Sequence, residues 1–499
     1  MSMQPLIIRN CEVVPLDSVP CSDAAAFCAR LGEQLSAGGR LAAYYGFRHG
    51  TQTRLMAVVA WQTRGSFAAF SCAADPEMPS CAASFPQAQL FEREIAEQFG
   101  IAFPGHPWFK PVRFHKPLVP VNDLFSKPVG ITDYFSMASD EIHEVAVGPV
   151  HAGVIEPGHF RFLCHGENVF HLEISLGFQH RGVEQLLLGG PHTASRHIIE
   201  TSAGDSTAAH SLAYCQLMEA FSVCDTPPRA HALRGIALEL ERCANHIGDL
   251  GALAGDVGYL PTASYCGRIR GDALNATALL CGSRFGRSFI REGGVGFDCD
   301  GKRLARLIAD AGSIWADFTN AADLLWNEPS VLARFEGTGI VTKKDCEILG
   351  GVGPAARASG CNQDVRQDFP DGIYQFTHIP VVAHSQGDVF ARAFVRYGEV
   401  IHSLGFIKEQ CGSLPGGDVR AAYGPRKGGS FAVSLVEGWR GEVVHAAITD
   451  AQGAFLRYKI VDPSFHNWSL LSQALRGQQI SDFPLCNKSF NLSYCGYDL

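Results

Sequence analysis

The chain has 17 cysteines but no Cys-x-x-Cys anywhere in its 499 residues. Two thiolates separated by two residues can grip one metal ion from a single turn, and this spacing recurs in thiolate metal sites. The cysteines are instead scattered and odd in number. This distribution is typical of a reducing compartment, in which buried cysteines serve as small apolar residues. The sequence therefore predicts a cytoplasmic protein with no metal held by paired cysteines.

Other signals are missing too. The chain has no stretch of about 18 apolar residues, the length that a membrane-spanning helix requires. The N-terminus lacks the basic start and apolar run of a signal peptide. No glycine-rich loop stands between a strand-like and a helix-like segment, so we expect no nucleotide binding by this chain. The net charge of −9 argues against nucleic acid as a partner, because phosphate binding requires a basic surface.

The composition is that of a packed globular protein. Hydrophobic residues make up 46% and charged residues 18% of the chain, which excludes a disordered protein. The length favours two or more domains. The low charge and the 53 glycines fit either a large core or extensive burial against partner subunits.

The first 115 residues alternate between helix-like and strand-like segments. Helical periodicity covers residues 23–34 and 87–99, and strand-like runs cover 41–49, 53–62 and 66–73. This pattern predicts a small α+β domain over residues 1–115. Six prolines between positions 104 and 128 exclude a continuous helix or central strand there. We therefore place the domain boundary in this region and assign residues 116–144 to a proline-rich linker.

Residues 145–499 are predicted to form a large, mainly α-helical domain with peripheral β-sheets. A hairpin-like region precedes residue 175, and strand-like alternation returns over residues 429–461. Between them lie long helical patterns, over residues 210–221, 229–254 and 303–327. The predicted fold class is thus α+β, with a small N-terminal domain, a linker and a larger helical domain.

The helix expected at 229–254 carries a polar stripe on the face opposite its apolar one. Its members are Glu239, Arg242, His246 and Asp249. We favour a solvated face with internal ion pairs. The alternative is a polar face that conducts protons inside a larger assembly.

Several motifs resemble known families when taken in order. Residues 91–100 (FEREIAEQFG) and 105–114 (GHPWFKPVRF) resemble the 30-kDa subunit of respiratory complex I and the same domain of group 4 hydrogenases. The remaining motifs resemble the complex I 49-kDa subunit and the hydrogenase large subunit. They are residues 148–151 (GPVH), 156–162 (EPGHFRF), 176–184 (LGFQHRGVE), 337–340, 357–360, 437–442 (EGWRGE) and 461–467 (VDPSFHN). The fused order resembles formate hydrogenlyase large subunits and their hydrogenase-4 relatives.

The resemblance indicates where metal-ligating cysteines are missing. Nickel-iron hydrogenases hold their metals with one pair of cysteines near each end of the large subunit. The first pair falls on residues 200–206 (ETSAGDS), where Ala203 and Ser206 replace both ligands. Near the C-terminus, Cys486 and Cys495 have eight residues between them, which is not the metal-binding spacing. The resemblance therefore implies a metal-enzyme fold without a nickel-iron centre.

In complex I the corresponding cavity receives a quinone. The resemblance implies a loop histidine that binds the quinone, and both His151 and His159 qualify. It also implies an aspartate that backs this histidine, which is Asp256 here. The family's tyrosine falls on Gly204, a departure that puts ordinary quinone reduction in question, and Tyr214 is one substitute from a neighbouring turn.

Five further residues follow from the resemblance. Glu156 resembles a proton-passing carboxylate, although a partly exposed loop acid is an equal interpretation. Arg440 resembles the arginine beside the diatomic ligands of iron, and here we expect it to hold a carboxylate such as Glu184 or Asp205. Asp205 would alternatively relay protons. His180 and Arg181 are candidate cofactor-binding residues, with an Arg–Glu clamp as the favoured structural role. A buried arginine is rarely left unpaired.

Three functions follow from the resemblance. The favoured one is an electron- and proton-coupling subunit of a membrane-bound complex I-like oxidoreductase, which takes electrons from an iron–sulfur partner and passes them to a quinone or related acceptor. The alternatives are a non-catalytic scaffold and a nickel-iron hydrogenase with atypical ligands. Expected partners are an iron–sulfur small subunit and antiporter-like membrane subunits, with NAD handled by other subunits if at all. The expected place is the cytoplasmic side, peripheral on the inner face of the cell membrane.

Overall fold

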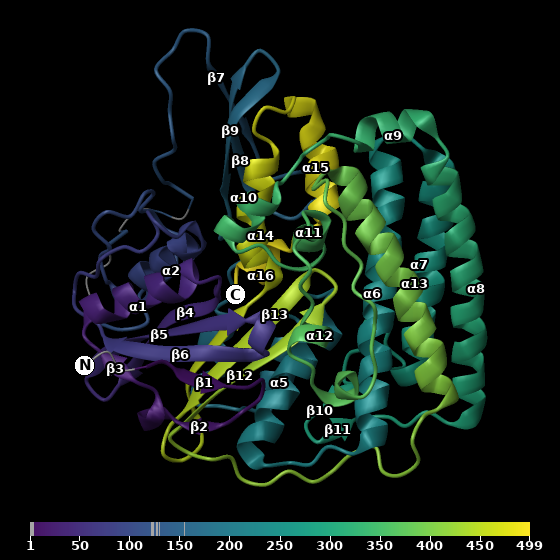
Figure 1. Cartoon of the computed structure of the whole chain (residues 1–499), viewed down its shortest axis with the longest axis horizontal. Coiled ribbons are helices and arrows are strands. Elements are labelled where there is room, and N and C mark those ends of the chain that lie inside the picture. Colours follow the sequence, from purple (N-terminus) through teal and green to yellow (C-terminus); the bar gives the residue numbers. More distant parts are fainter. Residues whose placement is uncertain (1–3, 121–123, 126–127, 129, 154) are drawn as a thin grey trace.

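The computed structural model describes residues 4–499 except 121–123, 126–127, 129 and 154. Figure 1 shows a small N-terminal part beside a tall group of helices, with a β-sheet between them. This arrangement confirms the predicted α+β fold class. The domain limits at residues 115 and 144 stay a prediction.

The N-terminal part is a five-stranded sheet covered by two helices. Its strand order is β1-β6-β5-β4, with β3 parallel to β6. The strands are β1 (Leu6–Ile8), β3 (Cys21–Ser22), β4 (Arg40–His49), β5 (Gln52–Trp61) and β6 (Ser66–Ala73). The helices are α1 (Ala24–Ser36) and α2 (Gln89–Phe99). Asp23 begins α1 by accepting the amide hydrogen of Ala26, and Gly100 ends α2 at φ +65°.

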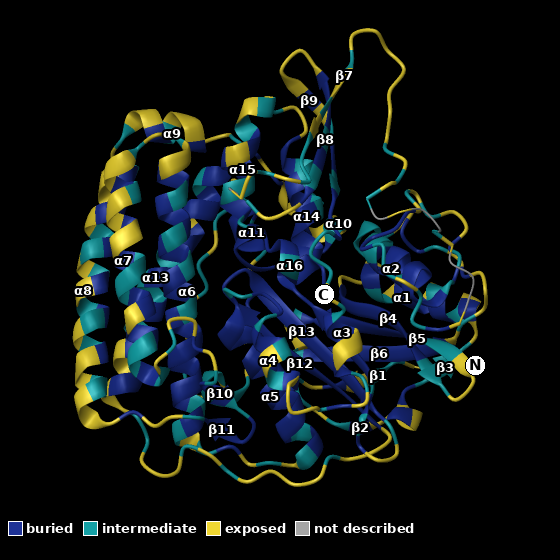
Figure 2. Ribbon diagram, turned by 180° about the vertical axis from the view of Figure 1, so that it is seen from behind, coloured by how far each residue is buried: buried dark blue, intermediate teal, exposed yellow. Residues whose placement is uncertain are grey.

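A second sheet connects the N-terminal segment to the end of the chain. Its order is β14-β13-β12-β2. It contains β2 (Val14–Pro15), β12 (Ser430–Gly438), β13 (Gly441–Thr449) and β14 (Phe455–Val461). Every residue of β12 and β13 is buried, because helices cover one face and the N-terminal part covers the other (Figures 1 and 2).

Five long helices form the helical region. They are α5 (Thr207–Ser222), α6 (Pro228–Asp256), α7 (Leu260–Cys281), α8 (Gly301–Trp326) and α13 (Val389–Gly412). Figure 2 shows exposed residues along the outer side of α8 and buried residues along α6. Helix α6 packs against α7, α13 and α15, which explains its burial. None of the helices in the described ranges combines the length and apolar character that a membrane crossing requires.

Shorter elements complete the fold. A three-stranded sheet projects from the body at the top of Figure 1, made of β7 (His143–Val147), β8 (His159–His165) and β9 (Asn168–Ser175). A two-stranded ribbon consists of β10 (Ile290–Arg291) and β11 (Gly294–Val295). The short helices are α3 (Val183–Leu187), α4 (Ser195–Glu200), α9 (Pro329–Phe335), α10 (Lys343–Leu349), α11 (Gly353–Ala358), α12 (Val365–Asp368), α14 (Pro463–Ala474), α15 (Phe483–Phe490) and α16 (Tyr494–Tyr497).

Candidate functional site

Arg440 lies where the α4–α5 loop meets the C-terminal segment. Its Nη1 and Nη2 atoms donate to the two carboxylate oxygens of Asp205 at 2.6 and 2.7 Å, and its Nε donates to the carbonyl of Asn491 at 2.6 Å. Its side chain is 5% exposed, while that of Asp205 is 35% exposed. Burial alone would lower the pKa of Arg440, but the charge of Asp205 holds it above its usual value. Of the two carboxylates expected from the sequence, Asp205 is the partner of Arg440.

The turn between β12 and β13 positions this arginine. Trp439 places its ring under the guanidinium group, 3.9 Å from centroid to Cζ, and its indole N–H donates to the carbonyl of Asp205 at 2.9 Å. A Cβ on Gly441 (φ +131°) would lie 2.8 Å from the Cα of Gly353. Only glycine therefore allows this turn to approach the start of α11 so closely.

The donor atoms at this position do not fit a nickel-iron centre. Ala203 is buried and offers no ligand, and the hydroxyl of Ser206 lies 3.4 Å from Arg440 Nη1. The two C-terminal thiols have different neighbours: a Cβ at Gly339 would lie 2.5 Å from Cys486 Sγ, whereas Cys495 Sγ lies 3.4 Å from Ser493 Oγ. Within the described residues, no group of three or more His, Cys, Asp or Glu side chains is placed to hold a metal. At this position the structure has an arginine–aspartate ion pair.

Arg181 fastens the α4–α5 loop to the C-terminal tail. It donates to the carbonyls of Thr201 at 2.7 Å and Ser202 at 2.8 Å, and its Nη2 lies 3.5 Å from the carbonyl of Cys495. The Arg–Glu clamp predicted within this motif is therefore wrong, because Arg181 bonds to main-chain carbonyls. Glu184 pairs instead with Arg457 and Lys459.

Glu156 lies at the exposed edge of this region. Burial raises the pKa of the nearby Tyr494 to about 12, and the charge of Glu156 adds to the increase. The same charge contributes to the raised pKa of the Cys495 thiol. Tyr494 was missed from the sequence, although its place between Ser493 and Cys495 in the C-terminal motif was a usable signal. The predicted substitute Tyr214 lies in the interior of α5 and packs against Tyr458.

The two loop histidines bond to main-chain carbonyls. His151 Nε2 lies 2.7 Å from the carbonyl of Gly158, and His159 Nδ1 lies 3.2 Å from that of Gly148. Burial lowers the pKa of His159, and its Nε2 has no hydrogen-bond partner within the part of the chain that the structure describes. Asp256 is the exposed last residue of α6.

Asp256 has no contact with either loop histidine. No hydrogen bond or ion pair between described residues joins it to His151 or His159. Partial burial raises the pKa of Asp256, and the charge of Lys488 opposes this increase. The quinone-site assignment of these three residues therefore stays a prediction. The remaining predicted residue, His180, places Nδ1 3.2 Å from the carbonyl of Asp498, and burial and the charge of Arg113 lower its pKa to about 4.

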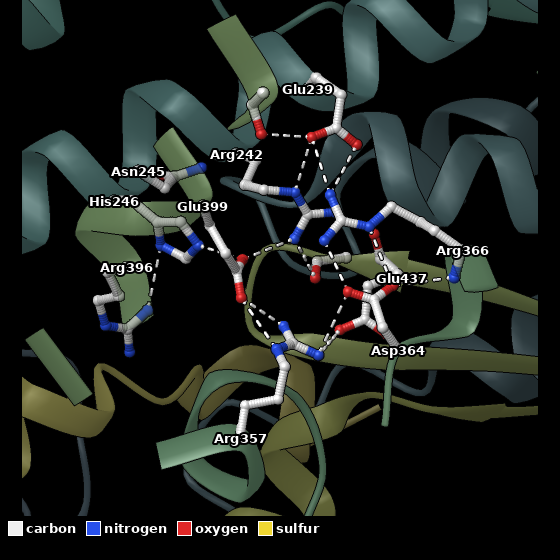
Figure 3. Close-up of polar contacts among 12 residues, drawn as sticks. Glu239, Arg242, Asn245, His246, Arg357, Asp364, Arg366, Arg396, Glu399 and Glu437 are labelled. Carbon is white, nitrogen blue, oxygen red and sulfur yellow. Dashed lines mark hydrogen bonds and ion pairs between the residues drawn. The ribbon is translucent and has the colours of Figure 1, made fainter. Parts of the chain in front are cut away.

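The polar stripe of α6 faces the protein interior. Glu239, Arg242 and His246 are 0% exposed, and Asp249 is 2% exposed. The favoured prediction of a solvated face is therefore wrong. The helix is covered on several sides, and its polar side chains pair with groups on α12, α13 and β12 (Figure 3).

The contacts of Arg440 continue inward through this stripe. Asn491, whose carbonyl accepts from Arg440, donates its side-chain amide to Asp249 at 2.5 Å. Asp249 pairs with Arg396 at 3.0 Å, and Arg396 Nη1 lies 3.2 Å from His246 Nδ1. A series of polar contacts thus reaches from the partly exposed Asp205 to a histidine in the core.

From His246 the series reaches β12 (Figure 3). His246 Nε2 lies 3.0 Å from Glu399 Oε2, and Glu399 Oε1 accepts from Arg357 Nη2 at 2.6 Å. Arg357 Nη1 donates to Glu437 Oε1 at 2.8 Å. Both nitrogens of His246 therefore take part, which places this ring at the junction between Arg396 and Glu399.

Four more residues complete what we call the buried ion network. Arg366 pairs with Asp364 at 2.6 Å and with Glu239 at 3.1 Å, and Arg242 pairs with Glu239 at 3.0 Å. The network holds six carboxylates and five guanidinium groups besides His246: Asp205, Glu239, Asp249, Asp364, Glu399 and Glu437 with Arg242, Arg357, Arg366, Arg396 and Arg440.

One proton neutralises the buried ion network. Six carboxylates against five guanidinium groups leave one negative charge, which a proton on one carboxylate cancels. Burial and the charge of Asp364 raise the pKa of Glu437 to about 7, despite the opposing charge of Arg357. The network can therefore gain or lose a proton near neutral pH.

Sequence comparisons place these features in a family. The profile of the 49-kDa subunit of respiratory-chain NADH dehydrogenase matches residues 256–428 and 421–498, and that of the 30-kDa subunit matches residues 22–120. A carbon monoxide-induced hydrogenase of Rhodospirillum rubrum is 29% identical over 350 residues, which cover 70% of this chain and 97% of that protein.

Two relatives share more of the chain. Formate hydrogenlyase subunit 5 of Escherichia coli K12 is 29% identical over 84% of this chain and 76% of its own length. An NADH-quinone oxidoreductase subunit of Bacteroides thetaiotaomicron is 27% identical over 77% of this chain and 78% of its own length. The chain belongs to the family of complex I 49-kDa subunits and group 4 hydrogenase large subunits, with an N-terminal domain of the 30-kDa type.

Proposed function

We propose that this chain is the electron- and proton-coupling subunit of a membrane-bound, complex I-like assembly related to hydrogenases. Electrons would arrive from an iron–sulfur partner subunit and pass to a quinone or related acceptor. The observation that carries the proposal is the continuous series of polar contacts from Asp205, through Arg440 and His246, to Glu437. A site whose side chains do not fit a nickel-iron centre, linked to a titratable interior, is suited to coupling electron and proton movement.

Reduction of a quinone takes up two electrons and two protons, so the site needs hydrogen-bond donors and a proton supply. Because His159 Nδ1 donates to the carbonyl of Gly148, its unpartnered Nε2 atom would donate to one carbonyl oxygen of the acceptor only when the ring carries a second proton. Tyr494, beside Glu156, is the candidate donor to the other. Asp205 is exposed enough to exchange protons with solvent, and the buried ion network would relay the charge change inward.

The setting of the chain follows from this role. An iron–sulfur small subunit would cover the site and deliver electrons. Antiporter-like membrane subunits would respond to the charge change, with the chain held on the cytoplasmic face of the membrane. Oxidation of NADH, if the assembly performs it, would belong to other subunits.

A non-catalytic scaffold is the second candidate. The pairing of Arg440 with Asp205 and Asn491 favours it, because a satisfied arginine needs no ligand to remain stable in the core. A scaffold would hold the neighbouring subunits together without taking part in electron flow.

The test is purification of the tagged chain with its bound partners, followed by spectroscopy for a tetranuclear iron–sulfur cluster and an assay of quinone reduction. Replacing His159 with alanine or Asp256 with asparagine should reduce electron flow about tenfold or more, as loss of a positioned proton donor does. The control is Glu144→Gln, which removes an exposed ion pair with Arg161 on β8. Unchanged flow in the His159 and Asp256 variants would favour the scaffold, and recovery of a stable chain without partners would contradict both candidates.

A further inference from the structure

A cleft of about 640 Å³ lies between the N-terminal part and a wall made of helix α10 and residues 361–363. One wall includes Arg40 and Gln87 of the N-terminal part. The opposite wall includes Lys343, Cys346 and Cys361. The cleft is separate from the Asp205–Arg440 site in its lining, and none of the functions discussed above uses it.

Arg40 lines the cleft with a guanidinium group that has hydrogen-bond donors without partners among the described residues. Its side chain is 7% exposed and pairs through Nη2 with Glu442, while its Nε and Nη1 atoms are buried without hydrogen-bond partners among the described residues. Unpartnered buried N–H groups are costly, and a bound anion would satisfy them. Lys343 and Lys344 are exposed at the mouth and add positive charge.

Two thiols meet in this cleft. Cys346 on α10 is 1% exposed, and Cys361, which follows α11, is half-buried. Both side chains line the cleft, and each thiol acts on the pKa of the other. The effect of Cys346, assisted by the charge of Lys343, lowers the pKa of Cys361 against the opposing effects of burial and Glu347, while the pKa of Cys346 is raised. An accessible thiol of lowered pKa beside a buried one is the arrangement of an attacking and a resolving cysteine.

The segment between the two thiols reaches the buried ion network. It contains Arg357, which is 0% exposed and pairs with Glu399 and Glu437. It also contains Gly353, where a Cβ would lie 2.2 Å from the carbonyl of Arg440. A covalent bond between Cys346 and Cys361 would therefore restrain a segment that supports Arg440.

We propose that this cleft binds an anionic low-molecular-weight disulfide of the glutathione disulfide class, and that Cys361 and Cys346 exchange with it. The Cys361 thiolate attacks one sulfur, forms a mixed disulfide and releases one thiolate. The Cys346 thiol then gives up its proton and displaces the second thiolate, which leaves a Cys346–Cys361 disulfide. One disulfide and two protein thiols thus become one protein disulfide and two small thiols. This chemistry goes beyond the proposed electron transfer and does not depend on it.

The test treats the purified full-length chain with glutathione disulfide and maps the products by mass spectrometry. The native chain should form the Cys346–Cys361 disulfide, and Cys346→Ser should trap a glutathione adduct on Cys361. Cys361 should react about threefold or more faster with glutathione disulfide than with the neutral bis(2-hydroxyethyl) disulfide. This preference should fall as salt rises, because exposed lysines are screened.

Cys28 and Cys81 provide an internal control. Their thiols also act on the pKa of each other, but the charged side chain that acts on both is Glu92 rather than a lysine. Cys28 should therefore show no preference for the anionic disulfide. Replacing Lys343 with alanine should remove part of the preference at Cys361 without unfolding the chain, because this lysine is exposed. Equal rates at Cys28 and Cys361, or no adduct on Cys361 in the Cys346→Ser variant, would overturn the proposal.

Discussion

Replacing Asp205 with asparagine removes the carboxylate that balances Arg440 while keeping the size of the side chain. Removing one partner of a buried ion pair costs about 3–5 kcal/mol, because the remaining charge is left uncompensated. Asp205 is 35% exposed, so water can solvate part of the guanidinium group. The carbonyl of Asn491 and the ring of Trp439 also still hold it. We therefore expect a loss of about 2–3 kcal/mol.

The assay compares thermal unfolding of Asp205→Asn with that of Glu144→Gln. Glu144 pairs with Arg161 and has the same side-chain exposure as Asp205, 35%, but its arginine is 29% exposed rather than 5%. The exposed pair should contribute about 0–1 kcal/mol. At about 2–4 °C per kcal/mol, the midpoint should fall by about 4–12 °C in the Asp205 variant and by no more than about 4 °C in the control.

A double-mutant cycle isolates the pair itself. Combining Asp205→Asn with Arg440→Gln should recover part of the loss, because the unbalanced charge is then gone. A coupling free energy below about 0.5 kcal/mol, or equal midpoints for the Asp205 and Glu144 variants, would refute the reasoning. Arg440 would then be balanced by Asp249 and Asp462, whose charges also act on it.

Three further predictions concern pH and the C-terminal tail. Burial opposes the charge on Glu184, but Lys459 and Arg457 lower its pKa to about 2. The stability that Glu184 contributes should therefore be present above about pH 4.5 and lost as the pH falls towards 2. In urea titrations, the Glu184→Gln variant should lack this acid transition. Burial and Arg40 lower the pKa of His466 to about 3. Protonation of this histidine in the unfolded chain should therefore cost about 2 kcal/mol of stability between pH 6.5 and 5. The His466→Gln variant should lose less stability over this range, and a wild-type slope in the variant would contradict the prediction. Arg181→Ala should release the α4–α5 loop from the tail and speed limited proteolysis there at least threefold, with Arg268→Ala, an exposed arginine on α7, as the unaffected control.

The sequence was sufficient for the arrangement of the fold because the signals there are local. The helix expected at 229–254 is α6, and the strands expected at 41–49, 53–62 and 66–73 are β4, β5 and β6. A carboxylate partner for Arg440 was also expected, because a buried arginine is rarely left unpaired. The sequence offered Glu184 or Asp205, and the structure pairs Arg440 with Asp205.

The interior of the site could not be predicted from one chain segment at a time. The stripe on α6 has the spacing of a solvated face, and its burial depends on Arg357, Arg366 and Arg396, which come from distant segments. The C-terminal motif could have pointed to Tyr494, but not to its neighbour Glu156, which lies more than three hundred residues earlier. Side-chain partners that are remote in sequence leave no local periodicity.

The junction between the two parts of the chain has a consequence for its assembly. Glu94 of α2 is buried against Lys459 of β14 and Arg113, and Lys459 in turn holds Glu184. These bonds are complete without the peptide connection through residues 116–144. A protease nick in the exposed strap at 131–142 should therefore leave both fragments together as one particle. The covalent link is then not needed to hold the two parts together. Its effect is on synthesis, because a single reading frame produces both parts in equal number.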